Sequence, residues 1–137
     1  MKKIRSISLQ PASLYDWDKA FAKANWFHIT GITPAISAPT AEAALAAVRN
    51  AKQQGLTVSC DLNFRKKLWN WQPGTGTVEL ARETIRGLMP FINVVIANEE
   101  DCDLCLGIRA EATDVESGQL NIDAYQSVAR QIVSAFS

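Results

Sequence analysis

The chain has 137 residues, of which 47% are hydrophobic and 20% are charged, and its 14 basic and 14 acidic side chains give a formal net charge of zero. This length suffices for one domain with its own core, and the balanced charge favours neither nucleic acid nor an anionic membrane as a partner. No apolar stretch approaches the length of a membrane span or of a signal-peptide core, so we expect a cytoplasmic protein.

Hydrophobic periodicity and turn-forming residues divide the chain into helices and strands that alternate. Apolar, β-branched runs predict strands, and Ala-rich or amphipathic stretches predict helices. In chain order we expect an irregular start over 1–15, a short helix from Asp16, a strand over 26–30, a loop over 31–39, a helix from Thr40 to about Gln54, a strand over 56–60, an irregular segment over 62–76, a helix from Thr77 to about Leu88, a strand over 91–97, a helix over 98–107, a polar loop over 108–120 and a last helix from Asn121.

Polar residues at the predicted helix starts, and glycine or proline at the ends, support these boundaries. An N-cap side chain accepts a hydrogen bond from a first-turn N–H group, and glycine adopts the left-handed conformation that ends many helices. The expected N-caps are Asp16, Thr40, Thr77, Asn98 and Asn121, and the expected ends are Gly55, Pro90 and Gly107. The last helix is expected to turn an apolar stripe inward, made of Ile122, Tyr125, Val128, Ala129, Ile132 and Phe136.

Strands separated by helices predict right-handed crossovers and a parallel sheet. The fold class is therefore α/β, a doubly wound sheet of about three parallel strands with helices on both faces, occupying residues 16–137. The strand over 91–97 is apolar nearly throughout, which is typical of a strand covered on both faces. Because three strands are few for such a sheet, we expect the chain to be the middle of a larger domain.

The stretch 56–65 carries the strongest functional signal. A buried strand is followed by Asp61, Asn63 and Arg65 at alternate positions, and an extended chain would point all three to the same side. Ligands of open α/β sheets bind at the carboxyl ends of the strands. This spacing therefore predicts a ligand-binding edge, although a strand exit followed by a solvated loop gives the same pattern.

Other residues allow a functional and a structural interpretation. Cys102 and Cys105 form a C-x-x-C, which fits a redox dithiol or half of a zinc site, but the acidic residues around them disfavour thiolate and we favour a core position. His28 lies within an apolar strand, where a packed, hydrogen-bonded histidine is expected rather than a ligand or base. Trp69 and Trp71 beside cations could form a nucleic-acid patch, but only three charges lie there, and a ligand-facing loop is favoured.

Three motifs together identify a family. Residues 26–35 read WFHITGITPA, residues 61–69 read DLNFRKKLW and residues 98–101 read NEED. In this order, each at or just after a strand end, they resemble the ribokinase-like (pfkB) carbohydrate kinases and, within that family, the 2-keto-3-deoxygluconate kinases. The resemblance runs from about Asp16 to the last residue and implies transfer of a phosphoryl group from ATP, with Mg²⁺, to the primary hydroxyl of a sugar acid.

The resemblance also implies roles for substrate-side residues. Arg65 is the candidate for the substrate carboxylate, because a guanidinium offers a permanently charged, bidentate fork. Asp61 and Asn63 would shape the same edge. Gly31 and Thr33, on the loop after the first strand, would face the substrate, and a plain turn accounts for them equally well.

On the phosphate side, Asn98 and Asp101 occupy the family's N-x-x-E positions, with aspartate in place of glutamate. The resemblance makes Asn98 and Lys67 candidates for nucleotide or phosphate binding and Asp101 a candidate for Mg²⁺ binding through water, which fits the oxygen ligands and retained waters of Mg²⁺. Helix capping explains Asn98 and Asp101 as well and is compatible with the functional role.

One family motif does not occur in the sequence. The family's catalytic aspartate lies in a G-A-G-D motif, and these residues contain no G-x-G-D, so no catalytic residue is assigned and the chain alone is expected to be inactive. Its expected partners are a sugar acid and ATP, and either the missing part of the kinase or a second copy of the chain. The alternatives are a non-catalytic α/β module that binds a sugar acid or a partner subunit, and a fragment that does not fold stably.

Overall fold

The computed structural model describes residues 10–110 and 122–136. The expected cap at Asn121 and most of the expected loop over 108–120 lie outside the described residues, as does most of the irregular start. No helix in the described part of the chain is long and apolar enough to cross a membrane.

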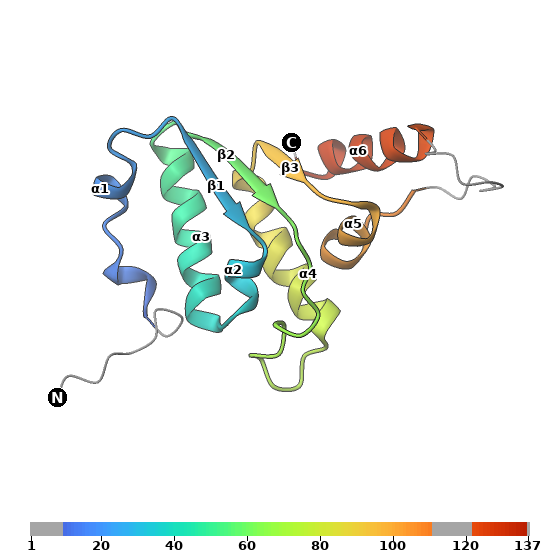
Figure 1. The fold of residues 1–137 in the computed structure, drawn as a ribbon, viewed down its shortest axis with the longest axis horizontal. Coiled ribbons are helices and arrows are strands. Elements are labelled where there is room, and N and C mark those ends of the chain that lie inside the picture. The colour runs from blue at the N-terminus through green and yellow to red at the C-terminus, as the bar shows by residue number, and fades with distance from the viewer. Residues whose placement is uncertain (1–9, 111–121, 137) are drawn as a thin grey trace.

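A parallel sheet forms the centre of the molecule (Figure 1). Its strands are β1 (Trp26–Thr30), β2 (Thr57–Asp61) and β3 (Val94–Ile96), in the order β1-β2-β3. Both pairs are parallel, so the three carboxyl ends meet at one edge. The predicted fold class, three parallel strands in one sheet with helices around it, is confirmed, with β2 displaced by one residue and β3 shorter than expected.

Helices connect the strands in the predicted order. The described helices are η2 (Ala12–Leu14), α1 (Trp17–Phe21), α2 (Ile32–Ala35), α3 (Ala38–Gln53), α4 (Thr77–Leu88), η3 (Met89–Phe91), α5 (Glu99–Leu106) and α6 (Ile122–Phe136), with η denoting a 3-10 helix. A helix of three or more turns lies between each pair of consecutive strands, α3 between β1 and β2 and α4 between β2 and β3. Such a helix is needed because the connection between parallel strands must run back along the sheet to its starting edge.

Two of the predicted N-caps are confirmed and two are wrong. The side chains of Asp16 and Asn98 accept hydrogen bonds from the N–H groups of the third helical residues, as expected. The start of α3 is capped by Ser37, whose hydroxyl accepts from the Thr40 N–H while the Thr40 hydroxyl accepts from the Ser37 N–H. The Thr40 hydroxyl therefore completes a capping box from inside the helix.

The second wrong cap is at α4, where Gly76 is the N-cap and Thr77 the first helical residue. The predicted loop over 31–39 contains the short helix α2. Pro34 is compatible with that helix because first-turn N–H groups have no intrahelical acceptor, so the missing donor costs nothing. Gly55 and Gly107 end α3 and α5 with positive φ angles of 79° and 71°, as expected.

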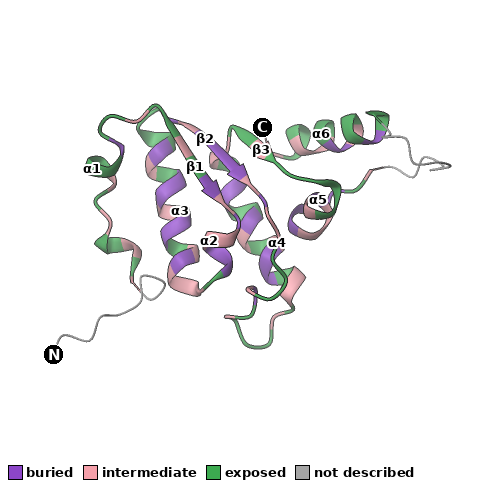
Figure 2. Cartoon of the chain, viewed as in Figure 1, coloured by how far each residue is buried: buried purple, intermediate pink, exposed green. Residues whose placement is uncertain are grey.

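One face of the sheet is buried against α3 and α4, which lie behind β1 and β2 in Figure 1. Side chains pointing to this face include Ile29, Val58 and Cys60, all at most 5% exposed. Residues of the helices complete the core, among them Val48 of α3 and Ile85 of α4, both fully buried. Figure 2 shows the buried positions of the chain concentrated along α3, α4 and β2.

The opposite face of the sheet is open within the described residues. The register aligns His28 with Ser59 and Val94, so these side chains share a face. Trp26 is 57% and Ile96 51% exposed there. The expectation of cover on both faces of the third strand is therefore wrong for the described residues, because no described helix packs on the second face.

The predicted core position of His28 is wrong for the same reason. The side chain of His28 points to the open face of the sheet and is exposed. Its Nδ1 lies 2.8 Å from the hydroxyl of Ser59, which also accepts a hydrogen bond of 2.8 Å from the indole N–H of Trp26. Hydrogen bonding at the strand surface, rather than core packing, thus holds the imidazole.

The last helix, α6, stands off from the sheet and encloses an apolar groove with β3 and α5, lined in part by Tyr125, Ile132 and Phe136. Ala124 and Val128 are buried, whereas Ile122 is 66% and Tyr125 43% exposed. The predicted stripe is therefore only partly inward, because no described strand lies beside the free edge of β3 to receive it.

Candidate functional site

The candidate site lies where the three strands end. The register places Thr30, Asp61 and Ile96 level with one another as the last residues of their strands. The segments that follow begin with Gly31, Leu62 and Ala97, so the motifs quoted from the sequence meet at this edge, the usual position of ligands in open α/β sheets.

Gly31 is held against the segment that leaves β2. Its N–H donates a 2.7 Å hydrogen bond to the carbonyl of Asp61. A Cβ atom at this position would lie 2.0 Å from the carbonyl oxygen of Leu62, so any side chain would collide with the main chain. Packing against β2 therefore requires glycine here whether or not a substrate binds. Thr33, its companion in the prediction, lies half-buried in α2.

The chain does not stay extended after β2. Asn63 has a φ of +41°, a left-handed conformation that asparagine tolerates better than most residues. The predicted alternation of Asp61, Asn63 and Arg65 toward one side is therefore broken. The amide of Asn63 turns instead to donate a 3.4 Å hydrogen bond to the hydroxyl of Thr30.

Thr30 is a site residue that the sequence analysis did not single out. Its hydroxyl accepts from Asn63 and, at 3.3 Å, from the N–H of Ile32, so it connects the ends of β1 and β2 with the start of α2. Its position as the last strand residue before Gly31 is the signal that could have identified it.

The cations of the segment after β2 are exposed. The Arg65 guanidinium donates to the carbonyl of Phe64 at 3.2 Å, and no carboxylate of the described residues forms an ion pair with it. Lys66 and Lys67 are also exposed. A guanidinium without an ion pair on a segment that leaves the carboxyl end of a parallel strand can bind a carboxylate or phosphate in its fork.

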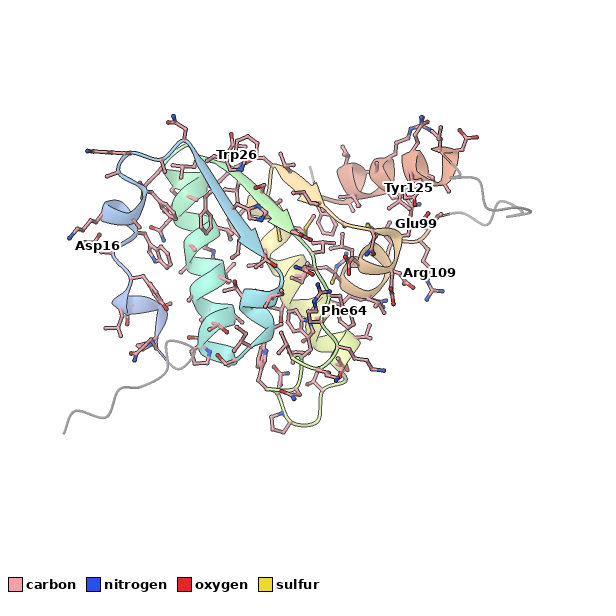
Figure 3. All side chains as sticks on the ribbon, viewed as in Figure 1. Asp16, Trp26, Phe64, Glu99, Arg109 and Tyr125 are labelled. Carbon is pink, nitrogen blue, oxygen red and sulfur yellow. The ribbon has the colours of Figure 1, made fainter. Side chains whose placement is uncertain are left out.

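Asn98 and Asp101 lie in the first turn of α5. The Asn98 side chain accepts from the Asp101 N–H at 2.7 Å, which is ordinary capping. The Asp101 carboxylate does not reach back to the helix start, as a carboxylate in a capping box would. Its Oδ1 instead accepts a 3.0 Å hydrogen bond from the N–H of Phe64. Figure 3 shows Phe64 on the segment that leaves β2 and Glu99 at the start of α5.

The two tryptophans of the segment 62–76 serve packing. Trp69 is 1% exposed in the core, so it is not accessible to stack on a base. Trp71 is half-buried, and its indole N–H donates to the carbonyl of Pro34 at 3.2 Å. Both contacts hold the segment against the body of the domain and disfavour the nucleic-acid interpretation.

The fit of the described residues to a metal is limited. No group of three possible ligands gathers in the described part of the chain, so a cage built from side chains alone is not present there. The carboxylates of Glu99, Glu100 and Asp101 lie near the ends of the strands, and Mg²⁺ commonly keeps several waters and takes only one or two carboxylates. Contact through water is the arrangement that fits.

The three thiols are buried and reduced, as the core interpretation of the C-x-x-C expected. Burial raises the pKa of the Cys60 thiol to about 12, and the charge of Asp61 adds to the effect. Burial, followed by the charge of Asp101, likewise raises the pKa of Cys105 to about 12. Because the thiolate is the reactive and metal-binding form, these cysteines are unsuited to redox or zinc chemistry.

Similarity to known proteins agrees with this geometry. Residues 5–130 match the family model of the pfkB family carbohydrate kinases. A 2-dehydro-3-deoxygalactonokinase from Haloferax volcanii is 33% identical over 91 residues, which cover 66% of this chain and 26% of that protein. The crystal structure of 2-dehydro-3-deoxygluconokinase from Thermotoga maritima is 34% identical, with a TM-score of 0.80, over 96% of this chain and 36% of that chain.

A PfkB protein from Polaromonas sp. JS666 is 28% identical, with a TM-score of 0.70, over 97% of this chain and 38% of that chain. The chain thus spans 26% of the curated relative and 36–38% of these two solved structures. The resemblance noted in the sequence is confirmed by a match that covers most of the chain. The chain belongs to the pfkB family of carbohydrate kinases.

Proposed function

We propose that this chain forms the sugar-acid side, and part of the phosphate side, of a kinase that transfers a phosphoryl group from ATP to the primary hydroxyl of 2-keto-3-deoxygluconate or a closely similar sugar acid. The family supports sugar phosphorylation, and the names of the relatives from Haloferax volcanii and Thermotoga maritima support the class of substrate. We place the activity in the cytoplasm, where ATP is available.

The observation that carries the proposal is the environment of Arg65. A 2-keto-3-deoxy sugar acid differs from a neutral sugar by its carboxylate, so its site needs a fixed positive charge. Arg65 is exposed on the segment that leaves β2, four residues beyond the strand's last residue, and pairs with no described carboxylate. In this role its guanidinium holds the substrate carboxylate, while Asp61 and Asn63, with Gly31 and Thr33 opposite, shape the sugar site.

On the phosphate side, Asn98 and Lys67 are proposed to contact the nucleotide, and Asp101 is proposed to contact Mg²⁺ through water. When bound, Mg²⁺ neutralises charge on the transferring phosphoryl group. One oxygen of Asp101 is occupied by the Phe64 N–H, and the other makes no hydrogen bond within the described residues. The second oxygen therefore supports a contact with a water of the metal.

The test is a calorimetric titration of the chain with 2-keto-3-deoxygluconate, comparing the parent with Arg65→Ala. A charge-assisted contact contributes about 1.5–3 kcal/mol, so the variant is expected to bind about 10- to 100-fold more weakly. Lys66→Ala is the matched control, because it removes a neighbouring exposed cation from the same segment and is expected to change the affinity less than threefold.

Fructose serves as a ligand control, because it lacks the carboxylate and its binding should not respond to Arg65→Ala. Equal losses of sugar-acid affinity in Arg65→Ala and Lys66→Ala would indicate general charge attraction and contradict the assignment of Arg65. Absence of sugar-acid binding by the parent chain would contradict the proposed substrate site.

A further inference from the structure

We propose that Asp101 is a positioning residue, which fixes the main chain of the segment carrying Asn63 and Arg65 to the first turn of α5. Its consequence for substrate binding rests on the function proposed above, whereas the structural claim does not. Asp101 thereby joins the two sides of the candidate site, because this residue, assigned to the phosphate side, determines where Arg65, assigned to the substrate carboxylate, lies.

The carrying observation is the 3.0 Å hydrogen bond from the Phe64 N–H to Asp101 Oδ1, between residues 37 positions apart. Phe64 lies between Asn63, whose φ of +41° redirects the chain, and the exposed Arg65. Asp101 is half-buried, so its bond to the amide is partly shielded from water, where a charge-assisted hydrogen bond is stronger.

The orientation of Asp101 supports a dedicated contact. A carboxylate at the third helical position usually reaches back to the N-cap N–H, and Asp101 instead points across to another segment. Glu99 and Glu100 in the same turn are exposed and form no ion pair within the described residues. Favourable interaction with the helix dipole is available to all three acidic residues, so it does not explain why only Asp101 makes this contact.

The segment has few other restraints close to Arg65. The N–H of Leu62 donates to the Ile96 carbonyl at 2.9 Å before the turn at Asn63, and the N–H of Leu68 donates to the Arg65 carbonyl at 2.9 Å after it. Phe64 between them packs only partly against the core. Without its bond to Asp101, the main chain from Asn63 to Arg65 would lose its tie to α5.

The test measures amide hydrogen exchange at Phe64 by NMR in the 137-residue chain, for the parent, Asp101→Ala and Asp101→Asn. Alanine removes the acceptor. Asparagine keeps an acceptor oxygen on a side chain of the same length and removes the charge. We expect exchange at Phe64 about 10- to 100-fold faster in Asp101→Ala, and less than about tenfold faster in Asp101→Asn, because removing the charge weakens the bond without removing its acceptor. Glu100→Ala, which removes a carboxylate from the same turn, should leave Phe64 unchanged.

Exchange at Val58 and Cys60 in β2 reports whether a variant has been destabilised throughout. Faster exchange at Phe64 alone supports the proposal, and equal acceleration in β2 overturns it, since that pattern shows general loss of stability. Unchanged exchange in Asp101→Ala also overturns it, as does an Asp101→Asn variant that behaves like alanine. If Asp101→Ala does not fold, Asp101→Ser carries the same test, because its hydroxyl is one bond too short to reach the amide.

A second measurement separates positioning from a general structural role. The affinity for 2-keto-3-deoxygluconate should fall about tenfold or more in Asp101→Ala and be retained in Asp101→Asn and Glu100→Ala. Retained affinity in Asp101→Ala, with faster exchange at Phe64, would overturn the positioning role. If the parent does not bind the sugar acid, the proposed function fails, and the exchange measurement still decides whether Asp101 holds the segment.

Discussion

At the residue scale, main-chain atoms determine much of the geometry at the carboxyl edge of the sheet. Asp61 acts there through its carbonyl, Gly31 through its N–H and its missing side chain, and Phe64 through its N–H. Such contacts depend on conformation more than on the identity of the side chain. They explain why the alternation of Asp61, Asn63 and Arg65 could not predict which of them point together.

Gly31 is the residue at which the importance of these main-chain contacts is most easily tested. A Cβ atom there would lie 2.0 Å from the Leu62 carbonyl oxygen, so Gly31→Ala must separate β1 from the segment leaving β2. Overpacking of this kind costs about 1–3 kcal/mol, and we expect the free energy of unfolding, measured by urea denaturation, to fall by about that amount.

The matched control is Gly87→Ala. Gly87 lies near the end of α4, is exposed, and has nothing within 4 Å of an added Cβ atom. Alanine in a helix is about 0.5–1 kcal/mol better than glycine, so this variant should be neutral or more stable. A Gly31→Ala chain as stable as the parent would show that the β1–β2 edge can move apart at little cost.

At the element scale, the local sequence predicted the strands and most helix ends. It was least reliable for the N-cap residues and for which faces of the sheet other elements pack against. Runs such as 26–30 identify a strand whatever packs on it. Serine and threonine are both good N-caps, so the sequence could not decide between Ser37 and Thr40. The structure decides it, because Ser37 is the residue with an extended backbone just before the first helical residue. The exposure of His28 and Ile96 depends on which elements cover the second face, information that a strand's own sequence does not contain.

Three thiols are buried, Cys60 of β2 and Cys102 and Cys105 of α5, and their raised pKa values predict a pH dependence of stability. Folded Cys60 stays protonated up to about pH 12, whereas in the unfolded chain it ionises near 8.5. The unfolded state therefore releases the proton first. The contribution to stability is complete below about pH 8.5 and is lost as the pH rises, by up to about 1.4 kcal/mol per pH unit.

The measurement is urea denaturation of the parent and of Cys60→Ala at pH 7, 9 and 10. The free energy of unfolding should fall with pH in both proteins, since Cys102 and Cys105 remain, but less steeply in the variant. Identical slopes would mean that Cys60 ionises alike in the folded and unfolded chains, and that its burial is incomplete in solution.

At the scale of the whole molecule, the sheet has one well-packed face and one face that the described residues leave open. Trp26, Val94 and Ile96 are 57%, 38% and 51% exposed on the second face of the sheet, and the apolar groove beside α6 adjoins the free edge of β3. Relatives that share the fold are about three times as long, since this chain covers 36% of the Thermotoga maritima structure. Exposed apolar faces and unpaired strand edges favour association of chains.

This chain matches only about a third of the length of its solved relatives, and we predict no measurable sugar kinase activity from these 137 residues alone. Phosphoryl transfer depends on a positioned base together with donors that stabilise charge on the phosphoryl group. Removing a single such donor lowers the rate by about 10²–10³, and the sequence has no G-x-G-D motif to supply the family's base and its neighbouring N–H groups.

A coupled ATP assay with 2-keto-3-deoxygluconate checks this expectation, with size-exclusion chromatography of the same sample and the 2-dehydro-3-deoxygluconokinase of Thermotoga maritima as the positive control. We expect no turnover above background and a sample that elutes ahead of the monomer, because the open sheet face favours self-association. Turnover in the range of about 1–100 s⁻¹ usual for kinases, from a fraction that elutes as a monomer, would contradict the prediction. The base would then have to lie among residues with no counterpart to that motif, and exchanging the carboxylates near the strand ends, Asp61 first, would locate it.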